Sequence, residues 1–553
     1  MIICRGKGVF KGIAIGKIRV FQKGELTINK VLIANADAEW KRFNEARKIA
    51  YNQLKILYDQ VIREIGKNDA AIFQIHQMLL EDVNYISSIE NIIRTEMVNS
   101  EYAISKTTDN IVFMFMAMDN AYIKARAADV QDISRRLITI LLGADEIRIN
   151  SDEPVIIIAD DLSPSETVQL DRDKVLAFVT IHGSVNSHTA ILARTMNIPS
   201  LIGTDIELNL DYNGKMAIVN GNDGTICIEP DRYMLEEHQV FLNDEEKRRE
   251  ELRNLRGREN ITLDGIKIDV VANICHAKDV ASVVRNDANG IGLFRSEFIF
   301  LEKDELPNEE EQFEIYSTVA KIMGKDKVFA IRTIDIGADK QMPSFKLPHE
   351  ENPAMGLRAI RFYIKYPEVF RTQMRALLRA SIYGKVAVIY PLITSMYEVL
   401  WIKNYVEKIK NELTEEGYEF DDIEQGIMIE TPAAVMISDK LAKEVDFFSI
   451  GTNDLSQYTL AADRQNPSID DYYDPYHIAV LRMIKIAVDN AKKNGIRAGI
   501  CGELASDPEL TGLFLALGVD ELSVSPSSVL PVRKTIIETD VSKIKDSIFS
   551  MIE

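Results

Sequence analysis

Hydrophobic and polar positions alternate with different periods in successive parts of the chain. The first twenty residues are rich in glycine and β-branched side chains, which predicts short strands and turns. From about residue 39 to residue 142, apolar residues recur at intervals of three and four without a proline, which predicts several long helices. Beyond residue 154, short apolar runs alternate with helical stretches, which is typical of an α/β unit. We therefore predict an α/β subdomain formed by 1–20 and 148–230, into which an all-helical subdomain, 21–147, is inserted.

A densely charged stretch without proline, residues 231–260, fits a helix. We interpret it as a linking helix between two halves of the chain; a solvated surface helix of the second half is the alternative. From residue 261 onward, eight short apolar runs alternate with helical spans: IKIDVVANI, NGIGLFR, KVFAIRT, KVAVIYPL, GIMIE, VDFFSIG, IRAGIC and VDELSVS. Eight buried strands separated by helices predict a (β/α)8 barrel, or TIM barrel, over 261–553. The predicted fold is thus multidomain α/β.

The composition is that of an ordinary core-forming protein, since 46% of the 553 residues are hydrophobic and 27% are charged. A net charge of −20 argues against nucleic-acid binding, because phosphate backbones require a basic surface. The sequence has no apolar run of about 18 residues, and its start lacks the pattern of a signal peptide, so we predict no membrane insertion. The 4 cysteines are scattered without a CxxC pair, which argues against a zinc ribbon and predicts a reduced, cytoplasmic protein.

Arginines are concentrated where predicted barrel strands end, or in the segments that follow them. They are Arg295, Arg332, Arg358, Arg361 and Arg464. The carboxyl ends of the strands form one face of such a barrel, and guanidinium groups that converge there repel one another unless an anion neutralises them. Guanidinium groups bind phosphate and carboxylate oxygens in a bidentate manner. We therefore predict a small substrate that carries a phosphate and a carboxylate.

Two acids lie among these arginines at predicted strand ends, Glu430 in GIMIET and Asp454 in SIGTNDL. Carboxylates without a nearby histidine or thiolate favour Mg²⁺, and the alternative is that either acid pairs with an arginine. Cys501 ends the seventh predicted strand, where it fits a proton donor as well as a small buried hydrophobic residue. The hydrophobic interpretation is preferred for the other cysteines, Cys4, Cys227 and Cys275.

His188 lies in the stretch HGSVNSHTAILAR, directly before an apolar helical run. In the first turn of a helix, free backbone N–H groups stabilise an anion, and an imidazole there stays neutral and nucleophilic. Metal binding is the weaker interpretation, since His182 is the other candidate ligand nearby and no third one accompanies the pair. A packed core histidine remains an alternative. We interpret His182 as a loop residue and His76, in IFQIHQMLLED, as a structural histidine on an apolar helical face.

Motifs along the whole chain resemble those of enzyme I of the bacterial phosphoenolpyruvate-dependent sugar phosphotransferase system. They are GIAIGKI, IFQIHQMLLED, AADVQDISRRL, DDLSPSETVQL, NSHTAILAR, GIGLFRSEF, IRTIDIGADK, ENPAMGLRAIR, GIMIETPAA, SIGTNDLSQYTLAADR and GICGELASD. Each motif alone is weak, but their combination is specific. The resemblance implies a swivelling phosphohistidine α/β domain with a helical insert that docks the carrier protein HPr. It also implies a C-terminal TIM barrel that binds phosphoenolpyruvate and forms a homodimer.

The same resemblance implies roles for individual residues. His188 is the phosphorylated nucleophile, and Thr167 matches a residue that hydrogen-bonds it. Glu430 and Asp454 are the Mg²⁺ ligands, and Cys501 protonates the enolate. The substrate-binding residues are Arg295, Arg332, Asn453, Asp454 and Arg464, and the clustering of arginines adds Arg358. The expected reaction transfers the phosphoryl group of phosphoenolpyruvate to His188 and then to a histidine of HPr, with release of pyruvate, as the first step of sugar uptake.

The sequence departs from the family pattern just before His188, where Ser184, Val185 and Asn186 replace the usual glycine, basic residue and threonine. A catalytically altered regulatory paralogue is therefore an alternative function. Pyruvate phosphate dikinase and phosphoenolpyruvate synthase share this chemistry, but they need an ATP-grasp domain for which the chain has no room. The acidic charge suits a basic docking surface on HPr, and candidate contacts on the helical insert are Met78, Leu79, Asp82 and Arg126.

Overall fold

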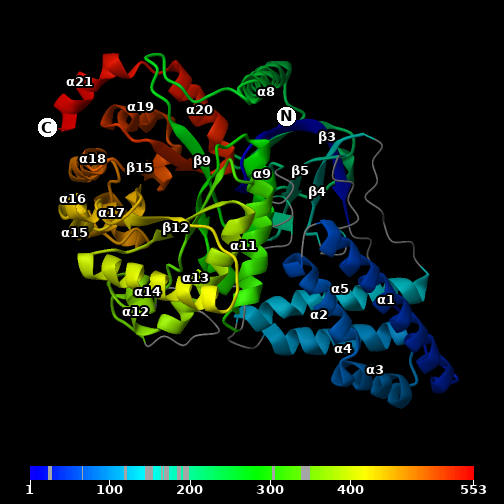
Figure 1. The fold of residues 1–553 in the computed structure, drawn as a ribbon. Helices are drawn as coiled ribbons and strands as arrows, with labels where there is room; N and C mark the ends of the chain where they lie inside the picture. Colours follow the sequence, from blue (N-terminus) through cyan, green and yellow to red (C-terminus); the bar gives the residue numbers. More distant parts are fainter. Residues whose placement is uncertain are drawn as a thin grey trace. The chain divides into compact units, whose positions relative to one another are not determined.

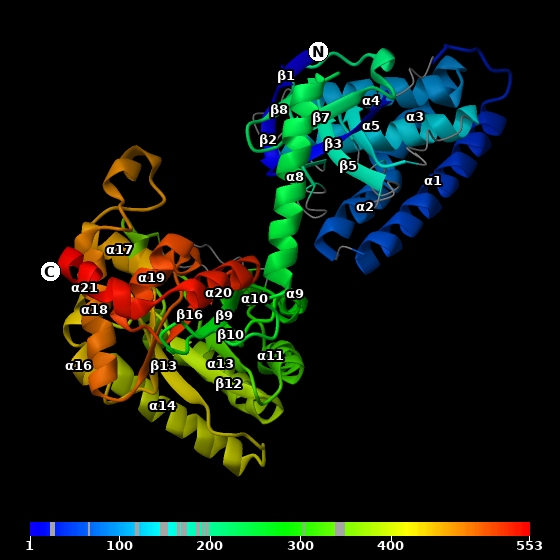
Figure 2. The same ribbon diagram turned by 90° about the horizontal axis from the view of Figure 1, so that it is seen from above.

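A computed structural model describes residues 1–22, 28–64, 67–116, 121–143, 153–162, 166, 174–183, 189, 190, 193, 198–301, 305–337 and 349–552. The chain forms two compact units, Met1–Glu246 and Lys247–Glu553. The boundary falls within helix α8, Arg232–Arg253, a continuous helix in which no residue is buried (Figure 2). This helix covers most of the stretch that we interpret as a link, and its charged side chains keep it solvated on all sides.

The first unit contains an eight-stranded mixed sheet with the strand order β1-β8-β7-β3-β4-β5-β6-β2 (Figure 1). Its strands are β1 Ile2–Arg5, β2 Lys7–Phe10, β3 Ile13–Phe21, β4 Val155–Ala159, β5 Val175–Thr180, β6 Ser200–Ile202, β7 Met216–Asn220 and β8 Thr225–Ile228. Strands β3 to β6 are parallel, and the other neighbouring pairs are antiparallel. Because Gly6 alone separates β1 from β2, which stand at opposite ends of the strand order, the sheet is strongly curled. A Cβ atom on Gly6 would lie 2.5 Å from Thr204 Cγ2, so glycine is needed there.

Burial explains the sequence pattern of this sheet. Strand β4 is buried along its full length and β5 nearly so, which accounts for their unbroken runs of apolar residues. The alternation of strands and helices beyond residue 154 thus predicted an α/β region correctly. Strand β6 was not predicted, because a strand of three residues is too short to show a period.

Five helices of the described chain lie between β3 and β4. They are α1 Ala36–Glu64, α2 Lys67–Leu80, α3 Val83–Glu96, α4 Ser100–Met116 and α5 Ala121–Leu142. Their apolar faces share a core that includes Phe43, Leu54 and Leu137. Asp82 caps α3, since its carboxylate accepts a hydrogen bond from Tyr85 N–H at 2.8 Å. The three- and four-residue spacing of apolar positions therefore predicted a helical insert correctly.

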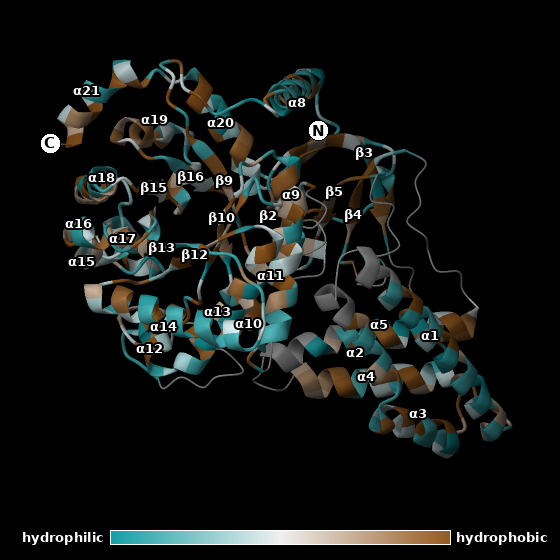
Figure 3. Cartoon of the chain, viewed as in Figure 1, coloured by the Kyte–Doolittle hydropathy of each residue, from teal (hydrophilic) through white to brown (hydrophobic). Residues whose placement is uncertain are grey.

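The second unit is a closed barrel of eight parallel strands (Figure 1). These strands are β9 Asp269–Ile274, β10 Ile291–Arg295, β11 Val328–Arg332, β12 Lys385–Tyr390, β13 Glu424–Ile429, β14 Phe447–Ile450, β15 Arg497–Ile500 and β16 Glu521–Val524. Each strand lies within one of the eight predicted apolar runs or overlaps it, so the barrel is confirmed. Hydrophobic residues are concentrated on strands such as β9, whereas α8 is largely hydrophilic (Figure 3).

Helices follow the barrel strands and cover them. The longer ones are α11 Glu309–Met323, α13 Pro367–Ala380, α14 Met396–Glu415, α17 Thr452–Leu460, α18 Ile478–Lys493, α19 Pro508–Leu517, α20 Val529–Glu538 and α21 Val541–Ile552. The shorter ones are α9 Val280–Arg285, α10 Glu297–Leu301, α12 Ile360–Lys365, α15 Pro432–Met436 and α16 Ser438–Leu441. Among the described residues, no helix has the length and apolar character needed to cross a membrane.

Candidate active site

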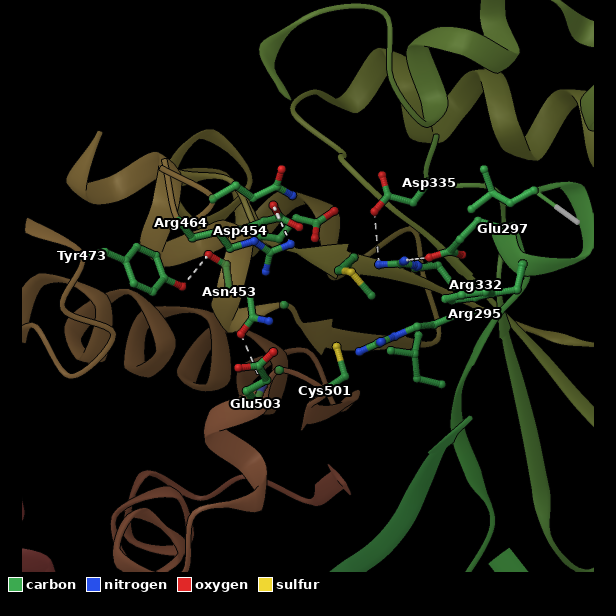
Figure 4. Close-up of a pocket in the computed structure, with 18 residues that line it drawn as sticks. Arg295, Glu297, Arg332, Asp335, Asn453, Asp454, Arg464, Tyr473, Cys501 and Glu503 are labelled. Carbon is green, nitrogen blue, oxygen red and sulfur yellow. Dashed lines mark hydrogen bonds and ion pairs between the residues drawn. The ribbon is translucent and has the colours of Figure 1, made fainter. Parts of the chain in front are cut away.

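A cavity of about 500 Å³ opens at the carboxyl ends of the barrel strands. Figure 4 shows that the side chains around it come from several strand ends and from the segments that follow them. They are Leu293, Arg295, Glu297, Phe298, Leu301, Arg332, Asp335, Met428, Glu430, Gly451, Asn453, Asp454, Arg464, Gln465, Tyr473, Cys501, Gly502 and Glu503. This is the face that carries the active site in barrels of this kind. Barrel closure therefore brings together seven of the residues singled out from the sequence, although they are spread over two hundred positions. They are Arg295, Arg332, Glu430, Asn453, Asp454, Arg464 and Cys501.

Arg332, the last residue of β11, is buried but keeps its positive charge. Its guanidinium pairs with Glu297, and its Nη1 atom lies 3.2 Å from Asp335 Oδ2. Burial opposes the charge of Arg332, but the carboxylates of Glu297 and Asp335 outweigh this effect and raise its pKa. The Arg332 guanidinium is thus a permanent cation in a fixed orientation.

Arg295 and Arg464 are held less tightly than Arg332. Arg295 ends β10 and has no carboxylate within ion-pair distance in the described part of the chain, and its guanidinium and the Cys501 thiol point toward one another (Figure 4). Arg464 Nη2 lies 3.9 Å from Asp454 Oδ1, at the limit of an ion pair. These two cations are therefore free to bind an anionic ligand.

Arg358 does not line the cavity. It is 3% exposed and lies behind Asp454, whose Oδ2 atom accepts a hydrogen bond from Arg358 Nη2 at 3.1 Å. Its Nε atom donates to Asp335 Oδ1 at 2.6 Å. Charges therefore alternate from Arg332 through Asp335 and Arg358 to Asp454, with Arg358 behind the three residues that line the cavity.

Glu430 and Asp454 are the two acids that could hold a metal ion. Glu430 follows β13, is 1% exposed, and its Oε1 atom accepts a hydrogen bond from Leu392 N–H at 2.6 Å. Burial raises the pKa of Glu430, and the negative charges of Asp454 and Asp335 raise it further. A divalent cation between Glu430 and Asp454 would relieve this repulsion. The described residues contain no group of three metal-ligating side chains, so such an ion would complete its coordination with ligand and water oxygens.

Asn453 and Cys501 complete the floor of the cavity. The side-chain Oδ1 atom of Asn453 accepts a hydrogen bond from Glu503 N–H at 3.3 Å. The backbone carbonyl of Asn453 accepts one from the Tyr473 hydroxyl at 3.2 Å. Cys501 is buried, and its thiol lies 3.5 Å from Ile450 O. Burial raises the pKa of Cys501 to about 11, so the thiol carries its proton at neutral pH.

Glu297 and Asp335 were missed by the sequence reasoning. Each acid lies close in sequence to a strand-end arginine, in FRSEF and in IRTID. This proximity was the available signal, because a buried arginine needs a carboxylate partner. Tyr473 was also missed, and its sequence context gives no comparable indication.

The phosphohistidine region of the first unit is described only in part. His188, Thr167 and the departures at 184–186 lie outside the described residues. Next to His188, Thr189 is buried, and its hydroxyl donates a hydrogen bond to Asp161 Oδ1 at 3.4 Å. His182 is exposed and lies 3.5 Å from Asp160, in agreement with a loop position.

His76 in the helical insert is fully buried. Its ring packs against Phe73, and its Nε2 atom lies 3.4 Å from Asp129 Oδ1. Its Nδ1 atom lies 3.7 Å from Asp132 Oδ2. These contacts join α2 to α5, as expected of a structural histidine.

Comparisons with known proteins show the family to which the chain belongs. Three domains of phosphoenolpyruvate (PEP)-utilising enzymes match the chain: the N-terminal domain at 5–126, the mobile domain at 151–224 and the PEP-binding domain at 249–541. The phosphoenolpyruvate-protein phosphotransferase of Bacillus sp. (strain S) is 40% identical over 99% of this chain and 95% of its own length, and that of Bacillus subtilis is 40% identical over 99% and 97%. Among solved structures, an NMR structure of Enzyme I is 32% identical over 44% of this chain and 99% of its own, with a TM-score of 0.38. The chain therefore belongs to the phosphoenolpyruvate-protein phosphotransferase family.

Proposed function

We propose that this chain transfers the phosphoryl group of PEP to its own His188 and then to a histidine of HPr, and that it releases pyruvate. The observation that carries the proposal is the meeting of three arginines, two acids and a protonated thiol in one cavity: Arg295, Arg332, Arg464, Glu430, Asp454 and Cys501. PEP carries a phosphate and a carboxylate, which matches these cations. The 40% identity to phosphoenolpyruvate-protein phosphotransferases over nearly the whole chain supports the same reaction.

The cations have distinct tasks in this reaction. Arg332 is oriented by Glu297 and Asp335 before PEP arrives, so little reorganisation is needed when charge develops on the phosphoryl oxygens. Arg295 and Arg464 lack a close carboxylate partner in the described chain, and we assign them to the substrate anion together with the Asn453 amide. Arg358 acts through Asp454, which it holds in place.

Glu430 and Asp454 are the residues that would hold Mg²⁺. The donor set fits this hard cation, because it consists of two carboxylates whose mutual repulsion an ion would offset. When bound, Mg²⁺ would neutralise part of the charge on the substrate oxygens.

The chemical step exchanges one bond of phosphorus for another. The lone pair of a His188 imidazole nitrogen attacks phosphorus, and the bond from phosphorus to the enol oxygen breaks. Cys501 then gives its thiol proton to C3 of the enolate, and pyruvate forms. The raised pKa of Cys501 suits this role, because the proton stays on sulfur until a carbanion accepts it.

The second transfer requires a partner that reaches the first unit. We propose that HPr docks on the helical insert, where Met78 and Asp82 are exposed, Leu79 is half-buried, and Arg126 pairs with Asp129 at 2.9 Å. We assign 1–20 and 148–230 to the phosphohistidine subdomain and 21–147 to the insert. The link at 231–260 would then let His188 alternate between PEP and HPr.

The barrel unit would also carry the homodimer contact. Tyr397 and Leu400 are exposed on α14 and border a groove of about 280 Å³ together with Trp401 and Tyr405. Exposed aromatic and apolar side chains of this kind are typical of the centre of an interface.

Labelled PEP tests the proposed reaction. The protein is incubated with Mg²⁺ and PEP labelled in the phosphoryl group, and we expect acid-labile, base-stable label on His188, which HPr then removes without ATP. A His188→Ala variant should take up no label, whereas His182→Ala, a neighbouring exposed histidine, should be labelled like wild type. A wild-type protein that takes up no label would support the regulatory alternative, and equal labelling of His188→Ala would assign the phosphate elsewhere.

A further inference from the structure

Asn273, on β9, is a polar side chain inside the barrel for which the reaction above has no role. Its neighbours Ala272 and Ile274 belong to the outer hydrophobic core, so the alternation of side chains directs Asn273 toward the barrel interior. Its Nδ2 group donates hydrogen bonds to Ser523 O at 2.9 Å and to Cys501 O at 3.3 Å. Its Oδ1 atom accepts one from Ser523 Oγ at 2.5 Å. One amide therefore connects β9 with the ends of β15 and β16.

This amide acts where the backbone pairing of two strands stops. β15 and β16 pair only through Gly499 with Glu521 and Ile500 with Leu522. Cys501 comes directly after the last pair, and its carbonyl accepts its hydrogen bond from the Asn273 side chain. On the other side, Cys501 N–H donates to Ile450 O at 3.1 Å, and the thiol lies 3.5 Å from the same oxygen. Cys501 is thus fixed by β14 at its amide and by Asn273 at its carbonyl.

The motif GIGLFR provides the space for this arrangement. A Cβ atom on Gly292 of β10 would lie 2.4 Å from Ser523 Oγ and 2.2 Å from Val271 Cγ2. Any larger residue at position 292 would displace the hydroxyl that orients the Asn273 amide. Gly292 therefore preserves the hydrogen bonds between Asn273 and Ser523.

We infer that Asn273 is a positioning residue that holds Cys501 so that its thiol delivers the proton to one face of the enolate. The inference rests on the proposed function, in which Cys501 is the acid. In this step the S–H bond of Cys501 breaks, a C–H bond forms at C3 of the enolate, and the thiolate regains a proton from solvent. A small error in the direction of the thiol slows such a step and lets solvent protonate either face.

The configuration of the product tests this role directly. PEP that carries deuterium stereospecifically at C3 is allowed to react in tritiated water with the full-length protein, Mg²⁺ and HPr, and the chirality of the pyruvate methyl group is measured. The wild type should give one configuration. Asn273→Asp keeps the size of the side chain but replaces the donor NH₂ with an acceptor, so we expect a mixture of configurations. We also expect kcat to fall about 10- to 100-fold, with KM for PEP within about twofold of wild type.

Two further variants separate positioning from stability. Asn289→Asp is the matched control. Asn289 Oδ1 accepts a hydrogen bond at 3.1 Å from the N–H of Val270, which lies on β9 like Asn273 but away from Cys501. The new carboxylate can still accept this hydrogen bond, so the variant should keep a single configuration and a kcat close to that of wild type. Ser523→Ala removes only the hydroxyl and should give a smaller loss of configuration than Asn273→Asp; it decides the matter if Asn273→Asp does not fold. Retention of one configuration and of wild-type kcat in both test variants would overturn the inference, whereas a wild type without label on His188 would overturn the proposed function instead.

Discussion

At the scale of single residues, the cavity is organised by unequal pairing of its charges. Asp335 stands between two buried guanidinium groups, with Arg332 Nη1 at 3.2 Å and Arg358 Nε at 2.6 Å. Arg295 has no carboxylate partner in the described chain. A buried cation is costly without a carboxylate partner, so Arg332 and Arg358 stay paired with Asp335 and fixed in position. Arg295 has no such partner in the part that the structure describes and is available to a ligand. The pairing therefore distinguishes cations that are fixed by carboxylates from cations that are available to a ligand, which the residue types alone do not.

Replacement of Asp335 by asparagine tests this distinction. The amide keeps the shape of the side chain but leaves Arg332 and Arg358 with one negative charge fewer, and we expect the free energy of unfolding of the barrel unit to fall by about 3–5 kcal/mol. Urea denaturation, followed by circular dichroism, measures the change. The control is Lys325→Met, which breaks an exposed ion pair with Asp421 in the same unit and should leave stability unchanged. An equal response of both variants would contradict the assignment of Asp335.

The Cys501 thiol gives a prediction that depends on pH. Its pKa is raised to about 11, so the protonated form persists in neutral and mildly alkaline solution, and thiolate forms only as pH approaches that value. Alkylation of Cys501 by iodoacetamide should therefore be slow at neutral pH and accelerate strongly in alkali, as measured by mass spectrometry. Cys501→Ser should lower kcat about 10²- to 10⁴-fold with KM for PEP little changed. Rapid alkylation at neutral pH would contradict the raised pKa.

At the scale of elements, Arg533 of α20 attaches the segment after α8 to the barrel. Its buried guanidinium donates to Leu255 O at 3.0 Å and to Asn260 Oδ1 at 2.7 Å. It also pairs with Asp287, which accepts a hydrogen bond from Gly257 N–H at 2.7 Å. Residues 255–260 are thus fixed to the barrel, whereas α8 before them has no buried residue. Any reorientation of the first unit must therefore take place before Leu255.

Arg533→Met tests this attachment. The substitution keeps an apolar stem but removes the hydrogen bonds that the guanidinium donates to Leu255 and Asn260. We expect the barrel unit to lose about 3 kcal/mol of unfolding free energy. Limited trypsin digestion should then cleave faster after Arg256 and Arg258, with the fragments identified by mass spectrometry. The control is Lys534→Met, whose pairing with Glu251 is exposed. Unchanged cleavage in Arg533→Met would show that the segment is held by other contacts.

At the scale of the whole molecule, two compact units should respond separately to ligand. In the proposed function PEP with Mg²⁺ binds the native barrel unit, so the calorimetric transition of that unit should shift to higher temperature. Its free energy of unfolding should rise by about 2.7 kcal/mol at a ligand concentration of 100 Kd. The transition of the first unit should not move. Addition of EDTA should reverse most of the shift, because Glu430 and Asp454 then repel each other again. A shift of both transitions would mean that the units unfold cooperatively.

The sequence by itself determined the positions of the barrel strands and the helical insert. Buried strands must be short apolar runs and helices must repeat their apolar residues every three to four positions, so KVFAIRT and GIMIE are recognisable as strands from their residue types alone. It also predicted that Arg295, Glu430 and Cys501 lie at one face of the barrel, because polar residues at the carboxyl ends of buried strands meet there.

The tertiary structure alone decided which charges are paired. Arg358 and Asp454 are 96 positions apart, yet Arg358 supports Asp454 from behind and does not line the cavity. Likewise, Asn273 reaches Cys501 across 228 positions. Such contacts depend on the register of neighbouring strands and on closure of the barrel, which place side chains to within a hydrogen-bond length. Periodicity along the chain carries no information about distances of that kind, so the sequence indicated which groups are present and the fold decided which of them are free to react.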